Sequence, residues 1–199
     1  MSKVICIDAG HGGTDPGAVN GRYKESEATL GIANKIADKL KAKGHRVVLT
    51  RTKDQALLLQ QRCDISNAAK ADAFISIHCN SAENRDASGI ETFKYPGVGG
   101  VTKRLAENIQ NGLASNFPEE KNRGVKEAQY YVLKHTKAPA ALVEVGFLSH
   151  DETAEKLFRF SYQDPKSRSK RSRYSSENDV LIEKSVKYTD FFLLSIVYV

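Results

Sequence analysis

Apolar residues follow two rhythms along most of the chain. Short unbroken runs alternate with longer stretches in which apolar residues recur three or four positions apart. The short runs are typical of buried strands, and the longer stretches are typical of helices with one buried face. Strands are predicted at residues 4–8, 46–50, 73–78, 90–94, 130–133 and 140–145, and helices from near Ala28 to Gly44, over 55–69 and over 101–117. This alternation predicts an α/β fold, a single domain whose twisted, mostly parallel sheet is covered by helices on both faces.

The pattern fails towards the C-terminus. Asp151 begins another predicted helix, but residues 159–165 interrupt it. Residues 161–178 are polar and rich in Ser, Lys and Arg, and residues 179–199 are apolar again without a clear period. We therefore predict a folded domain over residues 1–160, followed by a basic linker and a short apolar tail over residues 161–199.

The composition is that of an ordinary globular protein of 199 residues, 40% of them hydrophobic and 27% charged. Three cysteines cannot form a closed set of disulfides, so we expect reduced thiols in a chain made in the cytoplasm. No signal peptide is apparent, and the apolar run at residues 191–199 is short compared with the roughly 20 residues of a membrane span. We therefore expect neither a secreted, disulfide-rich protein nor a membrane span.

The net charge is +6, and five cations are clustered between Lys166 and Arg173. Such a cluster attracts polyanions, although it more often marks a solvated segment. No nucleic-acid recognition motif accompanies it, and the glycines near His11 form neither a Gly-Lys-Ser/Thr nor a GxGxxG phosphate-binding loop. We expect no nucleic-acid partner, and we expect the positive charge to favour approach to anionic polymers.

Three predicted strands lead into residues that can bind a metal or transfer a proton. The first strand runs into His11, the third ends at His78, and the last contains Glu144. Because the carboxyl ends of parallel strands share one edge of the sheet, the two histidines can be neighbours there. A catalytic zinc ion needs a third protein ligand. Glu25 and Glu27 both qualify, although acidic residues are also common in a first helical turn.

Glu144 lies within an apolar run, Ala140 to Phe147, that is expected to be buried. A buried carboxylate must be paired, bound to a metal or held with a raised pKa. It is therefore either the partner of Arg51 or Arg62 in a structural salt bridge, or a general base beside the metal. Cys79 follows His78 directly, but successive strand side chains point to opposite faces, which argues against a Cys–His nucleophile.

Several motifs in order along the chain resemble those of the zinc-dependent N-acetylmuramoyl-L-alanine amidases, the cell-wall hydrolases of bacterial autolysins, sporulation amidases and phage endolysins. The matching segments are Ile7–Ala18, Lys24–Glu27 with Leu30, Leu49–Arg51, Arg62 with Asn67, Ala71–Asp72, Phe74–Ser81 and Pro139–Ser149. The resemblance covers about residues 3 to 157. Relatives usually continue into a final amphipathic helix packed on the sheet, and the polar stretch after residue 158 departs from that pattern.

The resemblance implies one zinc ion bound by His11, Glu25 and His78, with Glu144 as the catalytic acid/base. It also implies site-supporting roles for Asn80, Arg51 and Arg62. The implied reaction is hydrolysis of the amide between the lactyl group of N-acetylmuramic acid and L-alanine in peptidoglycan. With no signal peptide, the expected setting is a cell wall reached through a separate membrane pore, as for a phage endolysin; a sporulation or autolytic enzyme exported by another route is the alternative. Residues 161–199 are expected to take no part in catalysis.

Two other interpretations remain open at this point. A zinc peptidase or carboxypeptidase acting on wall peptides would use a compatible set of ligands, although the HExxH and HxxE patterns are absent. A non-catalytic module that binds the wall would need neither the ligands nor Glu144, and all four residues are present.

Overall fold

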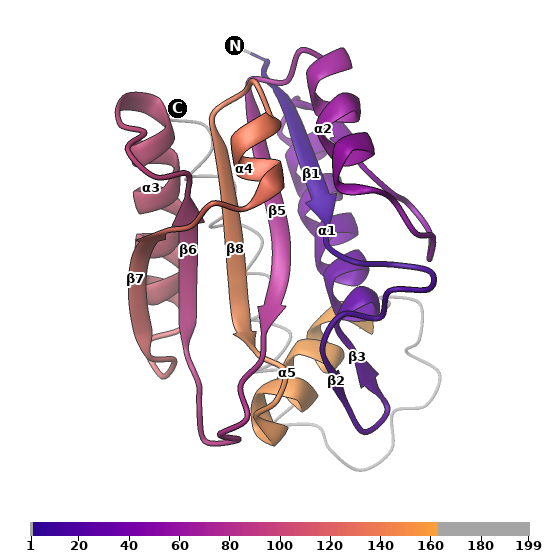
Figure 1. The fold of residues 1–199 in the computed structure, drawn as a ribbon, viewed down its shortest axis with the longest axis vertical. Helices are drawn as coiled ribbons and strands as arrows, with labels where there is room; N and C mark the ends of the chain where they lie inside the picture. Colours follow the sequence, from indigo (N-terminus) through magenta and orange to yellow (C-terminus); the bar gives the residue numbers. More distant parts are fainter. Residues whose placement is uncertain (1, 163–199) are drawn as a thin grey trace.

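The computed structural model describes residues 2–162, and these form a three-layer α/β domain (Figure 1). The central sheet has six strands in the order β4-β1-β5-β8-β6-β7. All neighbouring strands run parallel except β6 and β8, which are antiparallel. The strands are β1 (Val4–Ala9), β4 (Arg46–Leu49), β5 (Ala73–Asn80), β6 (Ile90–Lys94), β7 (Asn122–Glu127) and β8 (Ala140–Phe147). The predicted fold class is confirmed.

Helices cover both faces of this sheet. The larger layer contains α1 (Glu25–Ala42), α3 (Gly100–Asn116) and α5 (Asp151–Tyr162), which pack on the face that is behind the sheet in Figure 1. The smaller layer contains α2 (Leu59–Ala68) and α4 (Tyr131–His135) on the opposite face. Alternate strand residues point to the two layers: Ile75 and Ile77 lie in the larger core, and Phe74 lies in the smaller one.

The burial pattern explains why these segments form these elements. Ile32, Ile36 and Leu40 of α1 are fully buried and lie four residues apart, so one face of the helix packs on the sheet. Strand β5 is covered on both sides, and its residues 73–77 are all buried. A strand covered on both faces reads as an unbroken apolar run rather than as an alternating one.

Two predicted elements differ from the structure. The predicted strand at residues 130–133 is wrong, because Tyr131–His135 forms the short helix α4, whose Val132 and Leu133 pack in the smaller core. An apolar run of that length does not distinguish a strand from a buried helical turn. Strand β7 was not predicted, since its sequence Asn-Arg-Gly-Val-Lys-Glu is polar and its residues are half-buried at the sheet edge.

Several boundaries also differ. Helix α1 begins at Glu25, three residues before the predicted start, and follows a small hairpin of β2 (Val19–Asn20) and β3 (Tyr23–Lys24) that was not predicted. Helix α5 continues to Tyr162, through the first residues of the predicted interruption. Ser161 is buried against Gly31 of α1, so the end of α5 belongs to the packed domain. The predicted linker and tail otherwise lie outside the described residues.

None of the helices within residues 2–162 combines the length and the apolar character that crossing a membrane requires.

Candidate metal centre and active site

The first functional loop follows β1 and carries His11 in a left-handed backbone conformation, with φ of 60°. Two glycines make this loop possible. A Cβ atom on Gly10 would lie 2.4 Å from Cε1 of His78, and one on Gly17 would lie 2.5 Å from Oε2 of Glu25. Gly17 also has a φ of +66°, which side-chain-bearing residues rarely adopt. The loop backbone can therefore lie directly against two of the predicted ligands only because these positions are glycine.

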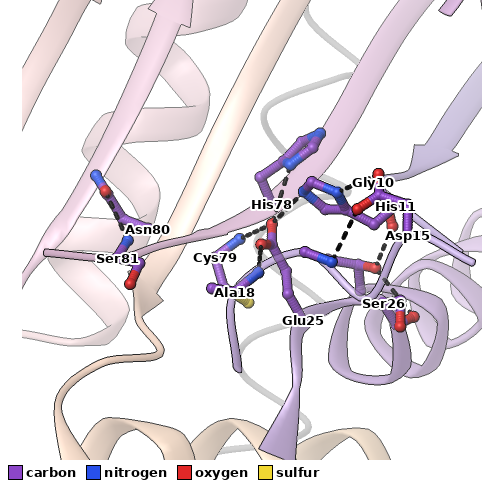
Figure 2. Close-up of polar contacts among 12 residues, drawn as sticks. Gly10, His11, Asp15, Ala18, Glu25, Ser26, His78, Cys79, Asn80 and Ser81 are labelled. Carbon is purple, nitrogen blue, oxygen red and sulfur yellow. Dashed lines mark hydrogen bonds and ion pairs between the residues drawn. The ribbon is translucent and has the colours of Figure 1, made fainter. Parts of the chain in front are cut away.

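His11, Glu25 and His78 converge at the carboxyl ends of β1 and β5, with Glu25 supplied by the first turn of α1 (Figure 2). Oε1 of Glu25 lies 3.1 Å from Nε2 of His11 and 3.0 Å from Nδ1 of His78. The two imidazole rings meet edge to face with centroids 4.8 Å apart. One ligand atom from each residue lies within 4.8 Å of the others. Within residues 2–162 this is the group of His, Cys, Asp or Glu side chains whose spacing could hold a metal ion.

Glu25 is the carboxylate of this cluster, and Glu27 is not. Glu25 is buried, and its two oxygens accept hydrogen bonds from the backbone N–H groups of Cys79 and Ala18, at 2.9 and 2.8 Å. Burial acts to raise the pKa of Glu25, but hydrogen bonds with the two histidines outweigh it and hold the pKa far below its usual range. Glu27 keeps 37% of its side chain exposed and lies beside Lys24.

A second carboxylate contacts the other side of His11. Oδ2 of Asp15 lies 2.8 Å from Nδ1 of His11, and Oδ1 accepts the backbone N–H of Gly17 (Figure 2). Burial acts to lower the pKa of His11, but its bonds with Glu25 and Asp15 raise the pKa to about 9. An ionised carboxylate can only accept, so the proton between His11 and Asp15 is carried by Nδ1, and Nε2, which faces Glu25, is the nitrogen that can give up its proton to bind a metal. We did not predict this role for Asp15, although it lies only four residues after His11 in the same loop.

Glu144 lies beside the cluster on the next strand. Strands β5 and β8 pair in a register that places Glu144 opposite His78, so both side chains lie on the same face of the sheet. Oε2 of Glu144 is buried and has no hydrogen-bond partner among the described residues. Burial and the nearby carboxylates Glu25 and Glu91, partly offset by the histidines, raise its pKa to about 7. The residue as a whole is half-buried. A carboxyl with one buried oxygen that titrates near neutrality is able to take up and release a proton under physiological conditions.

The structural alternative for Glu144 was a salt bridge with Arg51 or Arg62, and both arginines have other partners. Arg51 is buried and donates to the backbone carbonyls of Ala9, Gly10 and Ser26. Its guanidinium thereby joins the end of β1 to the first turn of α1, the two segments that carry His11 and Glu25.

Arg62 binds Asp8, which is 1% exposed at the end of β1, at 2.8 Å. Arg62 also donates to the backbone carbonyl of His11, while Thr50 and Ser76 donate their hydroxyls to Asp8. This buried network anchors the loop of His11, and Arg62 shares the Ala9 carbonyl with Arg51. We did not predict that Asp8 is the centre of this network, because a single acidic residue at a strand end has several common explanations.

Asn80 does not contact the three clustered residues. Its side chain lies apart from them in Figure 2, and its Nδ2 donates to Oε1 of Glu91 at 2.6 Å. Cys79 points to the opposite face of β5, where it is buried and burial raises the pKa of its thiol well above the ordinary value. A buried neutral thiol is a poor nucleophile, which agrees with the sequence-based argument against a Cys–His pair.

The arrangement has the donor set of a catalytic metal centre. Two imidazole nitrogens and one carboxylate oxygen are ligands that zinc prefers, and three protein ligands leave one position open for water or substrate. Two of the three ligands are oriented by a further contact: Asp15 on His11, and the backbone of Cys79 on Glu25. With a buried carboxyl alongside, the centre can support hydrolysis of a carbonyl compound by a metal-activated water.

Comparison with known proteins agrees with this chemistry. Residues 5–168 match the N-acetylmuramoyl-L-alanine amidase family. The amidase LytC of Bacillus subtilis is 40% identical over 167 residues, which are 82% of this chain but only 33% of LytC. A germination-specific N-acetylmuramoyl-L-alanine amidase of the same organism is 34% identical, and the match covers 81% of this chain and 74% of the relative. The solved catalytic domain of CwlV, an amidase of Paenibacillus polymyxa, superposes with a TM-score of 0.80 at 29% identity, covering 98% of this chain and 97% of that domain.

Proposed function

Because the chain belongs to the N-acetylmuramoyl-L-alanine amidase family, we propose that it is a zinc-dependent hydrolase of peptidoglycan. The bond that it cleaves is the amide between the lactyl group of N-acetylmuramic acid and L-alanine. The curated relatives with this name support the substrate, and one structural observation supports the chemistry. That observation is the cluster of His11, Glu25 and His78 beside Glu144, whose Oε2 is buried and unpartnered among the described residues.

In this proposal His11, Glu25 and His78 hold the zinc ion. When bound, zinc polarises the scissile carbonyl and brings the pKa of a water molecule to around 7. Asp15 keeps the proton of His11 on Nδ1, so that Nε2 is free to bind the metal. The backbone N–H groups of Ala18 and Cys79 hold the Glu25 carboxylate between the two imidazoles. The ligands are thus fixed before substrate arrives, which lowers the cost of organising the site.

Glu144 carries the proton in both halves of the reaction. Its Oε2 accepts a proton from the attacking water as the new C–O bond forms at the amide carbonyl. The same carboxyl then donates that proton to the amide nitrogen as the C–N bond breaks. The products are the lactyl carboxylate and the free amino group of L-alanine, so one water is consumed and Glu144 returns to its starting state. A pKa near 7 suits a group that must act in turn as base and acid.

The test combines zinc content with product analysis. Purified peptidoglycan is digested with the wild type, with Glu144→Gln and with His78→Ala, and the released ends are identified by mass spectrometry. We expect intact stem peptides with new L-alanine amino termini from the wild type only. The wild type and Glu144→Gln should each hold about one zinc per chain, whereas His78→Ala should lose it, because Glu144 is not a ligand in this proposal.

Other outcomes would reject the proposal in different ways. Release of a terminal amino acid would identify a carboxypeptidase, and zinc binding with no cleavage of any wall would identify a binding module. If Glu144→Gln keeps more than about a tenth of the wild-type turnover, Glu144 is not the catalytic acid/base, since such groups contribute about 10²–10⁴-fold to the rate. Glu83→Gln, in an exposed loop, is the matched control for loss of a carboxylate.

We also propose that the catalytic activity resides in the domain predicted over residues 1–160, with the last turn of α5 included, and that the tail takes no part in it. The end of α5 supports this extension, since Ser161 packs against Gly31. The net charge of +6 would favour approach to the anionic wall, an effect that added salt should weaken.

A further inference from the structure

A row of polar side chains continues from the candidate centre across the sheet. Glu144 of β8 is the register partner of His78 on one side and of Glu91, in β6, on the other. Register partners on neighbouring strands have side chains on the same face. All three residues therefore face the side of the sheet that carries α2 and α4, and β6 lies roughly 10 Å from β5.

Glu91 is only 3% exposed, and both of its carboxylate oxygens have partners. Oε1 accepts a hydrogen bond from Asn80, while Oε2 lies 2.8 Å from Nε of Arg123 and 2.5 Å from Nζ of Lys126. Burial acts to raise the pKa of Glu91, but the bonds from the two cations outweigh it and lower the pKa. One carboxylate is thus paired with two cations from β7, so Glu91 alone neutralises only one of these two positive charges.

The two cations differ in how firmly they are held. The guanidinium of Arg123 lies 4.9 Å above the Phe147 ring and donates to the carbonyl of Ser88, and its side chain is 28% exposed. The ammonium group of Lys126 lies 6.0 Å from the Phe93 ring, and its side chain is 40% exposed. The bond to Glu91 uses one of three N–H groups on Lys126. Lys126 therefore keeps donors for a ligand and is the more exposed of the two cations.

The distance between Lys126 and the proposed catalytic group Glu144 indicates which part of the proposed substrate Lys126 would contact. A strand spacing of about 4.8 Å separates Glu144 from Glu91, and a peptide residue spans at most about 3.6 Å. A group bound by Lys126 would therefore lie one or two residues from the scissile amide. The lactyl carboxyl is already consumed in that amide, so a carboxylate at this distance must belong to the peptide. Tyr130, which packs edge to face on Phe93 and is 40% exposed, borders the same region.

We propose that Lys126, held in place by Glu91, binds a carboxylate on the residue that follows L-alanine in the stem peptide, and so makes the enzyme prefer stems in which this group is free over stems in which it is amidated. The inference rests on the proposed amidase function. It assigns Lys126 a role in substrate selection and no role in bond cleavage.

The experiment uses two synthetic N-acetylmuramoyl tripeptides that differ only at the second residue, which carries either a free α-carboxylate or the carboxamide. The full-length, zinc-loaded wild type should cleave the carboxylate substrate with a kcat/KM about 10-fold higher, as expected for one charge-assisted hydrogen bond. Lys126→Gln should lose this preference, mainly through KM, while its activity on the carboxamide stays within about 2-fold of the wild type. Lys126→Arg should keep the preference, because the charge is retained.

Lys103→Gln is the matched control, since Lys103 is an exposed lysine of α3 that is also paired with a glutamate, Glu107. It should leave both substrates unaffected. Equal wild-type activity on the two tripeptides would overturn the inference, and so would an equal fall on both in Lys126→Gln, which would mean a structural role. In either case cleavage by the wild type would leave the amidase proposal standing. Cleavage of neither tripeptide, nor of intact wall, would defeat the amidase proposal, and this inference with it.

Discussion

Replacing Glu144 with Gln should stabilise the metal-free protein at pH 8 but not at pH 4.5, relative to the wild type. Burial and the neighbouring carboxylates raise the pKa of Glu144 from 4.5 to about 7. Because the folded-state pKa lies above the unfolded value, the contribution of this carboxyl to the stability of the wild type is greatest when it is neutral, below about pH 4.5. That stability is lost as the pH rises towards and through 7.

The magnitude follows from the difference between the two pKa values. A separation of about 2.5 pH units, at about 1.36 kcal/mol for each, corresponds to about 3 kcal/mol in the free energy of unfolding. Gln has nearly the same shape as Glu and cannot ionise, so the variant does not suffer this loss. Any constant effect of the new amide group is the same at every pH. The quantity of interest is therefore the change, between pH 4.5 and pH 8, in the stability difference between variant and wild type.

Urea unfolding followed by circular dichroism measures this quantity, with a chelator present so that no metal alters the charge beside Glu144. The stability difference should grow by about 3 kcal/mol in favour of Glu144→Gln. The same comparison with Glu83→Gln, in an exposed loop, should show no comparable change. A difference for Glu144→Gln that stays constant within about 0.5 kcal/mol would mean that water solvates this carboxyl, and the argument from burial would fail.

Four further outcomes are expected. Asp8→Ala should destabilise the protein by about 3–5 kcal/mol in urea unfolding, because the Arg62 charge would be left buried and unpaired; a loss below 1 kcal/mol would contradict this. Gly10→Ala should weaken zinc binding in a chelator competition by forcing the backbone away from His78, and wild-type affinity would show that the loop can adjust. Because the pKa of metal-free His11 is about 9, zinc affinity should rise from pH 6 to pH 9, with proton release detectable by calorimetry in buffers of different ionisation enthalpy. Deleting residues 163–199 should leave turnover on soluble muropeptides within about 2-fold of the full chain, and a large loss would refute the proposed domain boundary.

The sequence alone was sufficient to predict the fold class. Strands such as β5 are covered on both faces, and helices such as α1 on one, so each carries a hydrophobic pattern that can be recognised locally. The prediction failed where the pattern is short or polar. The run at residues 130–133 proved to be a helix, and the half-buried edge strand β7 has too little apolar character to be recognised. Lys126 lies on that unrecognised strand.

For the candidate site, the sequence determined which side chains stand at strand ends. It did not decide between Glu25 and Glu27, since both suit a first helical turn, and the resemblance was needed to choose. The tertiary structure put Glu25 between the two histidines, because the loop after β1 and the hairpin before α1 bring that turn against β5.

Only the tertiary structure decided what surrounds these residues. It assigned Arg51 and Arg62 to the backbone of the His11 loop rather than to Glu144, whose Oε2 remained buried without a partner among the described residues. Burial, register and long-range pairing set these contacts, and they join residues about 40 to 70 positions apart in the chain. A local pattern carries the propensity of a segment to form a strand or a helix. The charge state and partner of a side chain depend on segments that meet only after folding.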